Sequence, residues 1–304
     1  MRLRQQGFAI VLVIWALLLL TTIAASFAYS VRVETMGGIG LTDRVNAEAI
    51  ANAALHRTVF GLLVKDRKQA WVADGRVYEI PWPDTKVSVR IRSESGKVDL
   101  NYAPRELLEG LFETLLEDYD TTALAAAVID WRDKDTRPLP EGAEVEEYLR
   151  AGRRHGPPNS HFTTLSELAQ VMGFDGTSME ILRPHITIHS RRAKLDATVA
   201  SPLVLAVIPG IDRATAEEFV ETRRQRLDAG LPIDLTELGT GARHLESRAR
   251  ATALAIETDV ELPNGHKVRE QTVIRLMAKG NRFEYLDWRS LPLDDSEHFT
   301  GSDE

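Results

Sequence analysis

The stretch that decides the fold is Phe8–Tyr29, FAIVLVIWALLLLTTIAASFAY, because no charged residue interrupts this apolar run before Arg32. As a helix at ~1.5 Å per residue, the run spans roughly 33 Å, which is enough to cross the hydrocarbon core of a bilayer. Arg2 and Arg4 precede it, so the N-terminus is expected to stay in the cytoplasm. The sequence therefore predicts one membrane span, with the rest of the chain exported.

The residues of this segment leave three interpretations open. It can be a plain single-pass anchor, or a secretory signal peptide cut after the small residues Ser26–Ala28. The third interpretation places the cut between Gly7 and Phe8. A short basic leader that ends in Gly, followed by Phe and an apolar helix, resembles a type IV prepilin signal, and the helix then stays on the mature protein.

Leu12 bears on the third interpretation. Most pilin-like proteins have Glu at this place, where it pairs with the N-terminal amine of a neighbouring subunit. A carboxylate in the bilayer centre costs ~2.5–3.5 kcal/mol or more unless it has a partner. A subunit with no neighbour above it has no partner amine. Leu12 therefore suits a subunit at the tip of a filament, and it suits an ordinary anchor equally well.

Composition limits the class of protein. The 304 residues include 37 Lys+Arg, 45 Asp+Glu and no Cys, and 43% are hydrophobic. A chain of this kind buries a globular core, and the lack of Cys excludes a disulfide scaffold, a thiolate zinc site and a Cys nucleophile. The net charge of −8 argues against broad nucleic-acid binding and leaves room for a divalent cation.

Helical spacing continues beyond the membrane run to about Lys65, and a bend is expected at the glycines of 37–40 because each Gly weakens a helix. Arg76–Ile80 and Lys86–Arg92 alternate like half-buried strands. The chain ends in three more strands, expected over 256–262, 267–277 and 282–288. Turns are predicted at Pro263–His266, where Asn-Gly suits a type I′ hairpin, and at Gly280-Asn281.

The middle of the chain is predicted to be mainly helical. The expected helices are Arg105–Tyr119, Thr121–Asp133, Glu167–Met172, Pro202–Val207, Asp212–Arg226 and Arg243–Ala255, with a strand at His185–His189. Strands on both sides of a helical block indicate one sheet interrupted by an insertion. The predicted fold class is α+β: a long N-terminal transmembrane helix packed on a small antiparallel sheet, with a large inserted helical domain.

One weak internal repeat lies inside the helical block. Lys97–Pro104, KVDLNYAP, is echoed by Lys194–Pro202, KLDATVASP, and each segment leads into a predicted helix. Two copies are too few for a solenoid. A pair of related helical lobes is the expected result.

The chemistry of the chain concentrates in an acidic loop. Asp130, Asp133 and Asp135 lie near the predicted end of a helix and repel one another unless a cation lies among them. Oxygen ligands from a loop suit Ca²⁺, and the offsets do not match an EF-hand. The competing interpretation is a solvated acidic loop whose charges pair with Arg132, Arg137 and Arg153. On spacing alone the solvated loop is favoured.

Two other features bear on function: the IPGI loop and the motifs of hydrolases and phosphate-binding proteins. Ile208–Ile211, IPGI, resembles the loop of a helix-hairpin-helix that holds a DNA phosphate, although a purely structural helix pair is the favoured interpretation. No nucleophilic triad or phosphate loop is found, and Ser160 and His161 lack the turn of a hydrolase nucleophile. Spacing alone therefore offers no site for nucleophilic catalysis or for phosphate binding by a glycine-rich loop.

Taken together, the motifs resemble protein K of type II secretion, the large minor pseudopilin of the general secretion pathway. The resemblance covers nearly the full chain. Its specific pieces are the Gly7-Phe8 leader with Leu12, Gly96–Asn101, the Asp130-Trp-x-Asp133-x-Asp135 motif, Gly142–Glu144, Asn159-x-x-Phe162, Leu165–Leu168 and Val171–Phe174.

The resemblance implies a pilin-like fold, cleavage by prepilin peptidase between Gly7 and Phe8, and N-methylation of the new terminus. It places the protein in the inner membrane, with the N-terminus cytoplasmic and the bulk periplasmic, at the tip of a pseudopilus that exports folded proteins. Implied partners are the minor pseudopilins I and J, with H joining them, and the inner-membrane assembly platform; no nucleic acid is expected.

The resemblance also implies one or two calcium ions in the inserted domain. The ligand candidates carried over are Asp130, Asp133, Asp135, Glu144 and Asn159. The family usually has an acid directly after Glu144, where this chain has Val145. Glu146 or Glu147 is the substitute candidate, so a second ion is in question.

The expected organisation is a leader over 1–7, the membrane half of the long helix over 8–30, the pilin-like helix and first strands over 31–103, the inserted domain with the metal site over 104–190, a second helical module over 191–255, the strand meander over 256–290 and a loose tail over 291–304.

Two alternative functions come from other classes of protein. One is a DNA-binding or DNA-uptake membrane protein that uses the 208–226 hairpin, and the other is a metal-dependent periplasmic hydrolase built on the acidic loop.

Overall fold

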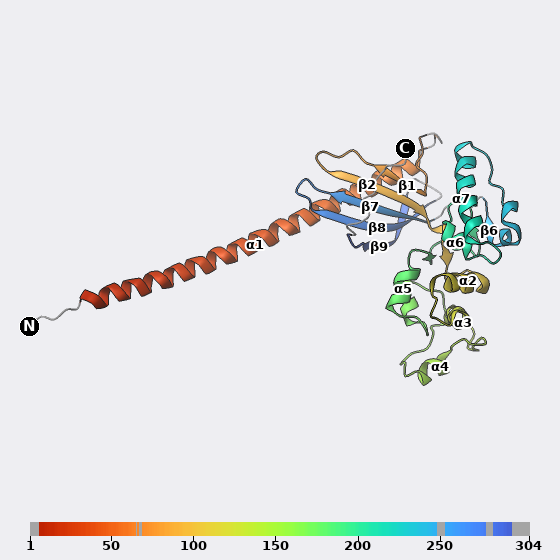
Figure 1. Cartoon of the computed structure of the whole chain (residues 1–304), viewed down its shortest axis with the longest axis horizontal. Helices are drawn as coiled ribbons and strands as arrows, with labels where there is room; N and C mark the ends of the chain where they lie inside the picture. Colours follow the sequence, from red (N-terminus) through yellow and green to blue (C-terminus); the bar gives the residue numbers. More distant parts are fainter. Residues whose placement is uncertain (1–5, 65, 67–68, 248–252, 278–281, 294–304) are drawn as a thin grey trace, which may run out of the picture.

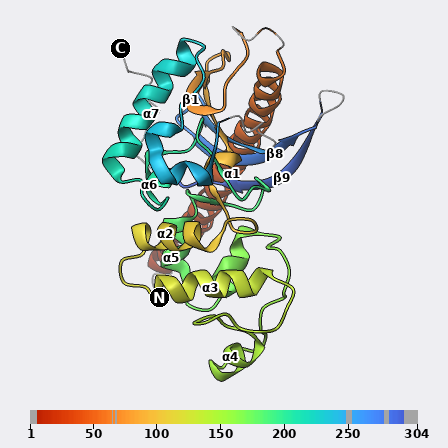
Figure 2. The ribbon, with the colours of Figure 1, turned by 90° about the vertical axis from the view of Figure 1, so that its right-hand side faces the viewer.

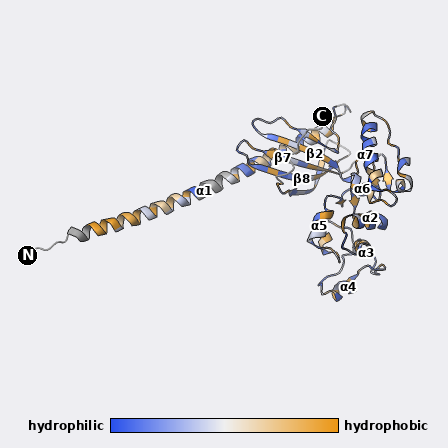
Figure 3. Cartoon of the chain, in the orientation of Figure 1, coloured by the Kyte–Doolittle hydropathy of each residue, from blue (hydrophilic) through white to orange (hydrophobic). Residues whose placement is uncertain are grey.

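The computed structural model describes residues 6–64, 66, 69–247, 253–277 and 282–293. Helix α1 (Gln6–Leu62) projects from the body as a single long rod (Figure 1). It runs unbroken through Gly37–Gly40, so the expected bend is absent. Within it, Ile10–Arg32 has the length and hydropathy of a membrane span and is not buried, and Figure 3 shows this part of the rod as its most apolar stretch.

A five-stranded antiparallel sheet lies against the far end of α1. Its strands are β1 (Asp74–Glu79), β2 (Lys86–Ser93), β7 (Ala253–Glu261), β8 (Lys267–Leu276) and β9 (Phe283–Ser290), in the order β1-β2-β7-β8-β9. The central pair joins β2 to β7, so that Val89 lies opposite Thr258. Everything between residues 94 and 252 is therefore inserted into one sheet, as predicted. A turn at Pro263–His266 is confirmed, but it is not the expected type I′ turn, because Gly265 has a positive φ of 83° and Asn264 does not.

The second half of α1 packs on one face of this sheet. Small side chains at Ala47, Ala51 and Ala54 let the helix lie close to β2 and β7. Further along α1, Leu55 and Val59 enter a second cluster with side chains of β2, β7 and β8. Burying each large aliphatic side chain contributes about 1.5–3 kcal/mol, so these contacts hold the rod on the sheet.

The inserted segment forms a separate helical block beyond the end of the sheet (Figure 2). Its helices are α2 (Arg105–Leu115), α3 (Thr121–Arg132), α4 (Val145–Arg150), α5 (Gly176–Leu182), α6 (Pro202–Ala206) and α7 (Arg213–Asp228), with 3₁₀ turns at Glu94–Gly96, Leu165–Gln170 and Thr236–His244. One hydrophobic core extends from Val98 to Leu245 through the whole block. The α2–α3 and α6–α7 pairs are thus packed around a common interior.

The internal repeat in the sequence corresponds to a repeat in the structure. Strand β3 (Val98–Asp99) pairs in parallel with β4 (Ile186–Thr187), and β5 (Leu195–Asp196) pairs in parallel with β6 (Leu245–Glu246). The buried carboxylates of Asp99 and Asp196 each accept a hydrogen bond from the backbone amide two residues on.

An arginine from the second helix of each pair completes the repeated unit. Arg132 of α3 donates to the carbonyls of Leu100 and Ala103, and Arg223 of α7 donates to those of Ala197 and Ala200. The equivalent contacts in both units confirm the expected pair of related lobes.

One predicted helix is wrong. The described residues 243–247 and 253–255 do not form the predicted α-helix: the 3₁₀ turn ends at His244, β6 follows, and β7 begins at Ala253. Alanine and arginine favour helices locally, but pairing with β2 and β8 on both sides decides the structure here. The predicted strand at His185–His189 is reduced to the two residues of β4, and Glu167–Met172 lies in a 3₁₀ turn. The leader residues 1–5, the turn at 280–281 and the tail beyond 293 lie outside the described residues.

Candidate metal centre

The acidic motif lies where α3 ends and a proline-containing loop leads to α4. Asp130 is fully buried on the last turn of α3. Its carboxylate accepts hydrogen bonds from the backbone amides of Leu139, at 3.2 Å, and Ala143, at 2.8 Å. Gly142 passes so close to Asp130 that a Cβ at this position would collide with the carboxylate. Asp130 therefore ties the loop to α3 and fixes the position of the next residue, Glu144.

Several oxygen atoms at this loop are buried without a hydrogen-bond partner. They are Oδ1 of Asp133, both carboxylate oxygens of Glu144 and Oδ1 of Asn159. The side chain of Glu144 is buried, because the residue is only 3% exposed. Buried polar atoms are nearly always paired in folded proteins, and an unpaired one costs about 1–3 kcal/mol, or more when it is charged. Four unpaired acceptors at one loop point to a missing positive group.

Asn159 joins the loop from the following segment. Its backbone has a φ of 51°, in the left-handed region that Asn tolerates better than most residues. Its side-chain amide donates to the carbonyl oxygen of Asp135, which leaves Oδ1 as the unpaired acceptor. The backbone amide of Ser160 donates to the carbonyl of Trp131, at 3.3 Å, and holds this segment against the end of α3.

The electrostatics of the loop agree with this geometry. Burial, followed by the nearby charges of Asp133 and Asp135, raises the pKa of Asp130 to about 6. Burial also raises the pKa values of Asp133 and Glu144, with further contributions from neighbouring carboxylates. Burial is thus the main cost of ionising these groups and repulsion among them a smaller one, and an added cation would reduce both.

Two of the three arginines of the competing interpretation, Arg132 and Arg153, donate their hydrogen bonds outside the acidic loop. Arg132 is directed to the carbonyls of Leu100 and Ala103 in the repeated unit described above. Arg153 donates to the carbonyl of Gln170 and lies over the ring of Tyr148, 5.6 Å from its centroid. These hydrogen bonds hold Arg132 and Arg153 in other positions, although the charge of Arg132 still acts to lower the pKa of Asp133.

Three predicted ligand candidates have other contacts. Glu146 lies on the outer side of α4, where its side chain is 84% exposed and pairs with Arg150 at 3.2 Å. Glu147 accepts the backbone amide of Glu144, at 3.0 Å, and so serves the start of the helix. Asp135 is exposed, and its carboxylate accepts the amide of Arg137. The fold brings Asp130, Asp133, Glu144 and Asn159 together and leaves Glu146 out.

The donor set fits calcium. The four unpaired oxygens belong to carboxylate or amide groups, the hard ligands that Ca²⁺ prefers, and the neighbouring Trp131 has one unpaired donor, its Nε1. Among the residues that the structure describes, no three acidic or histidine side chains already converge on one point as a finished metal cluster. A cation would therefore have to draw Asp133 and Glu144 inward. The sequence did not reveal why Gly142 is needed. The reason is visible only in the structure, where Gly142 lies too close to Asp130 for a side chain to fit.

The second candidate site, the IPGI loop, is closed to anions at its helix terminus. Asp212 caps α7, and its carboxylate accepts the backbone amide of Thr215 at 2.7 Å. Gly210 has a φ of 89°, as a tight turn requires, and lies against Thr240. At the start of α7 the backbone amide of Thr215 therefore already faces a carboxylate of the chain itself.

Comparison with known proteins was made on sequence. Residues 91–191 match the family described as type II secretion system (T2SS), protein K. The chain is 26% identical to the type II secretion system protein K of Pseudomonas aeruginosa, over 64% of each chain. It is also 26% identical to that of Klebsiella pneumoniae, over 60% of this chain and 62% of the relative. The matched part thus spans slightly less than two thirds of each relative.

Comparison on structure gives a neighbour with the same fold. A chain in the crystal structure of the GspK-GspI-GspJ complex from the enterotoxigenic Escherichia coli type 2 secretion system superimposes with a TM-score of 0.57. The alignment covers 86% of this chain and 99% of that one, at 18% sequence identity. The long helix, the interrupted sheet and the inserted block are therefore features of a known architecture.

Proposed function

We propose that this chain, which these matches identify as a protein K of the type II secretion family, is a minor pseudopilin at the tip of the pseudopilus. It starts or caps assembly of the filament that exports folded proteins across the outer membrane. The observation that carries the proposal is the inserted block between β2 and β7, which lies at the opposite end of the molecule from the membrane span (Figure 1).

The bulk of this block supplies the physical argument. Pilin-like subunits stack through their N-terminal helices with a small rise. A block placed beyond the sheet would overlap any subunit stacked above it, whereas at the end of a filament it meets none. Leu12 agrees with this position, because a subunit with no neighbour above has no terminal amine for a membrane carboxylate to meet.

The membrane end of the molecule has its own part in the proposal. Prepilin peptidase cuts between Gly7 and Phe8, the new terminus is N-methylated, and Ile10–Arg32 anchors the chain in the inner membrane with its body in the periplasm. The preceding basic residues support this orientation. The assembly platform would then extract the chain from the membrane as the filament grows.

The partners are the minor pseudopilins I and J, with H joining the complex. The similar structure is that of a GspK-GspI-GspJ complex, which supports I- and J-type partners for this chain. The chain acts by assembly rather than by catalysis. In the DNA-binding alternative the N-terminus of α7 would hold a phosphate, but Asp212 already occupies it. No observation favours the hydrolase alternative.

The calcium site has a structural part in the same proposal. Asp133, Glu144 and Asn159 would hold the ion, and Asp130 would keep the loop closed beneath it. The bound ion would supply the positive charge that these oxygens lack. Its effect would be to lock the loop between α3 and α4, on the outer part of the helical block.

The tip position can be tested by site-specific cross-linking in assembled pseudopili. The chain has no native Cys, so a single introduced Cys is unique. We expect Leu41→Cys on α1 to cross-link to other pseudopilins, because this side chain is 65% exposed beyond the membrane span. Leu149→Cys on α4, which is 56% exposed, should cross-link to no subunit stacked above. A cross-link from position 149 to the major pseudopilin would place the chain inside the filament and contradict the proposal.

A further inference from the structure

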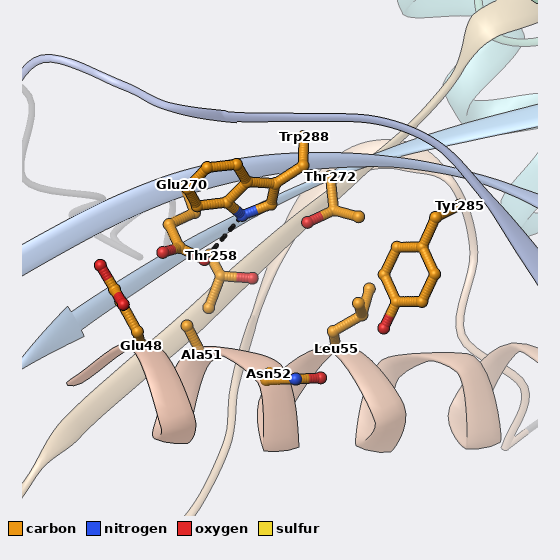
Figure 4. A pocket seen from close by; sticks show the side chains of 9 residues that line it. All are labelled: Glu48, Ala51, Asn52, Leu55, Thr258, Glu270, Thr272, Tyr285 and Trp288. Carbon is orange, nitrogen blue, oxygen red and sulfur yellow. Dashed lines mark hydrogen bonds between the residues drawn. The ribbon is translucent and has the colours of Figure 1, made fainter. Parts of the chain in front are cut away.

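A groove runs between α1 and the end strand β9. Its first part is a cavity of about 270 Å³, with Glu48, Asn52 and Leu55 on the helix side and Glu270, Tyr285 and Trp288 on the sheet side (Figure 4). A second, more apolar hollow of about 370 Å³ follows along α1, between His56, Phe60 and Phe283. Edge-to-face contacts of Phe283 with His56 and Tyr285 connect the two parts.

Glu270 is the unusual residue of this groove. The residue is only 7% exposed, and its Oε1 is buried with no hydrogen-bond partner. Its Oε2 accepts the indole N–H of Trp288 at 3.2 Å, the bond drawn in Figure 4. Burial raises the pKa of Glu270, and the neighbouring charge of Glu48 adds to the rise. The chain thus leaves one carboxylate oxygen in the cavity without a donor.

The nearby positive charge is already used. Arg44 donates to Glu48, which itself lines the cavity, at 2.7 Å. The attraction of Arg44 for Glu270 only partly offsets the effect of burial and of Glu48. With one arginine between two carboxylates, the acidic end of the groove keeps a net negative charge.

Exposed aromatic side chains line the rest of the groove. Tyr285 and Trp288 on β9 are each 53% exposed, and Phe60 on α1 is 65% exposed. Strand β9 is at one end of the strand order, so its outer edge pairs with no other strand of the sheet. Large aromatic residues around a central charged anchor are typical of sites that dominate protein–protein binding, and a guanidinium also stacks well on Trp and Tyr.

We propose that the groove between α1 and β9 docks a neighbouring protein chain, which inserts an arginine or lysine to pair with Glu270. The basic group would lie against Trp288 and Tyr285, and apolar side chains of the same partner would cover Phe60 and Phe283. A carboxylate buried without a donor is complementary to one cationic side chain. The inference rests on the proposed function at one point: the neighbouring chain is taken to be another subunit of the pseudopilus.

The first test compares Glu270→Gln with Glu284→Gln in the full chain. Gln keeps the shape of the side chain and an acceptor for Trp288, but removes the charge. Glu284 is on the neighbouring strand β9, is 54% exposed and pairs with Arg275 outside the groove, so it is the matched control. We expect E270Q to leave the isolated chain as stable or more stable, and to weaken its co-purification with I- and J-type pseudopilins at least tenfold. E284Q should leave co-purification unchanged.

The second test identifies the occupant. The photo-cross-linking residue p-benzoylphenylalanine replaces Tyr285 in the full chain, in cells that assemble the pseudopilus. The expected result is a cross-link to a protein chain whose attachment point, mapped by mass spectrometry, lies within a few residues of an Arg or Lys, and its loss in the E270Q background. No cross-link at 285, or one that E270Q leaves unchanged, would overturn the inference.

Two further outcomes separate the explanations. If E270Q lowers the thermal stability of the isolated chain and leaves the cross-link intact, Glu270 is only structural. If Arg44→Ala abolishes the cross-link as fully as E270Q does, Arg44 rather than a partner neutralises Glu270, and the docking inference fails. A cross-link with these properties to a chain outside the secretion system would keep the docking groove and overturn the proposed function instead.

Discussion

Gly110→Ala is expected to destabilise the helical block by about 3 kcal/mol or more, although alanine is the better helix former. Gly110 is inside α2, and a Cβ there would overlap the carbonyl oxygen of Val207 at the end of α6. Helix propensity alone predicts a gain of about 0.5–1 kcal/mol from this substitution. Overpacking in a closed core costs about 1–3 kcal/mol and sometimes more, and here the obstacle is backbone, which cannot rotate away.

Chemical denaturation of the full chain in detergent measures this effect, with Gly176→Ala as the matched control. Gly176 begins α5, and nothing lies within 4 Å of a Cβ placed there, so its substitution should be neutral or slightly stabilising. If G110A is as stable as the original chain, α2 and α6 do not make the close contact that joins the two repeated units.

Calcium is expected to raise the unfolding temperature of the chain by about 5–11 °C when the free ion is at a hundred times its Kd. That concentration stabilises the folded state by about 2.7 kcal/mol, and each kcal/mol corresponds to about 2–4 °C in a body of this size. The physical reason is the set of unpaired oxygens on Asp133, Glu144 and Asn159. Scanning calorimetry of the full chain in detergent, with calcium and then with a chelator, measures the shift.

Variants at the loop give this prediction its controls. Glu144→Gln removes the buried charge, so the calcium-dependent gain should disappear while the chelated protein stays as stable as before. Glu146→Gln changes an exposed residue that pairs with Arg150, and it should keep the full gain. An unfolding temperature that does not change with chelator would refute the site. A gain lost in E146Q but kept in E144Q would mean that the ligands are misassigned.

The features with a local signal could be predicted from the sequence. The apolar run was long enough to indicate a membrane helix, and alternation together with Asn264-Gly265 indicated the β7–β8 hairpin. The repeat of Lys97–Pro104 at Lys194–Pro202 indicated two related lobes, and both carry the same buried Asp and arginine contacts. In each of these cases the local pattern and the tertiary contacts favour the same structure.

The misses have long-range causes. Residues 253–255 look helical by themselves, and pairing with β2, far away in sequence, makes them a strand. Glu146 was expected among the ligands, but residues two apart on a helix face different sides, so α4 turns it away from Glu144. Glu270 looks like any polar residue of a strand. Its burial comes from α1 and β9, which no local pattern reveals.

The most direct test of the proposed function is the mass and N-terminal residue of the mature protein, made together with its prepilin peptidase. The account predicts a chain that begins at Phe8, with the added mass of one N-methyl group and with the apolar helix retained. A chain that keeps residues 1–7, or one cut after Ala28, would show an ordinary anchor or a released protein and would contradict the assignment as a pseudopilin.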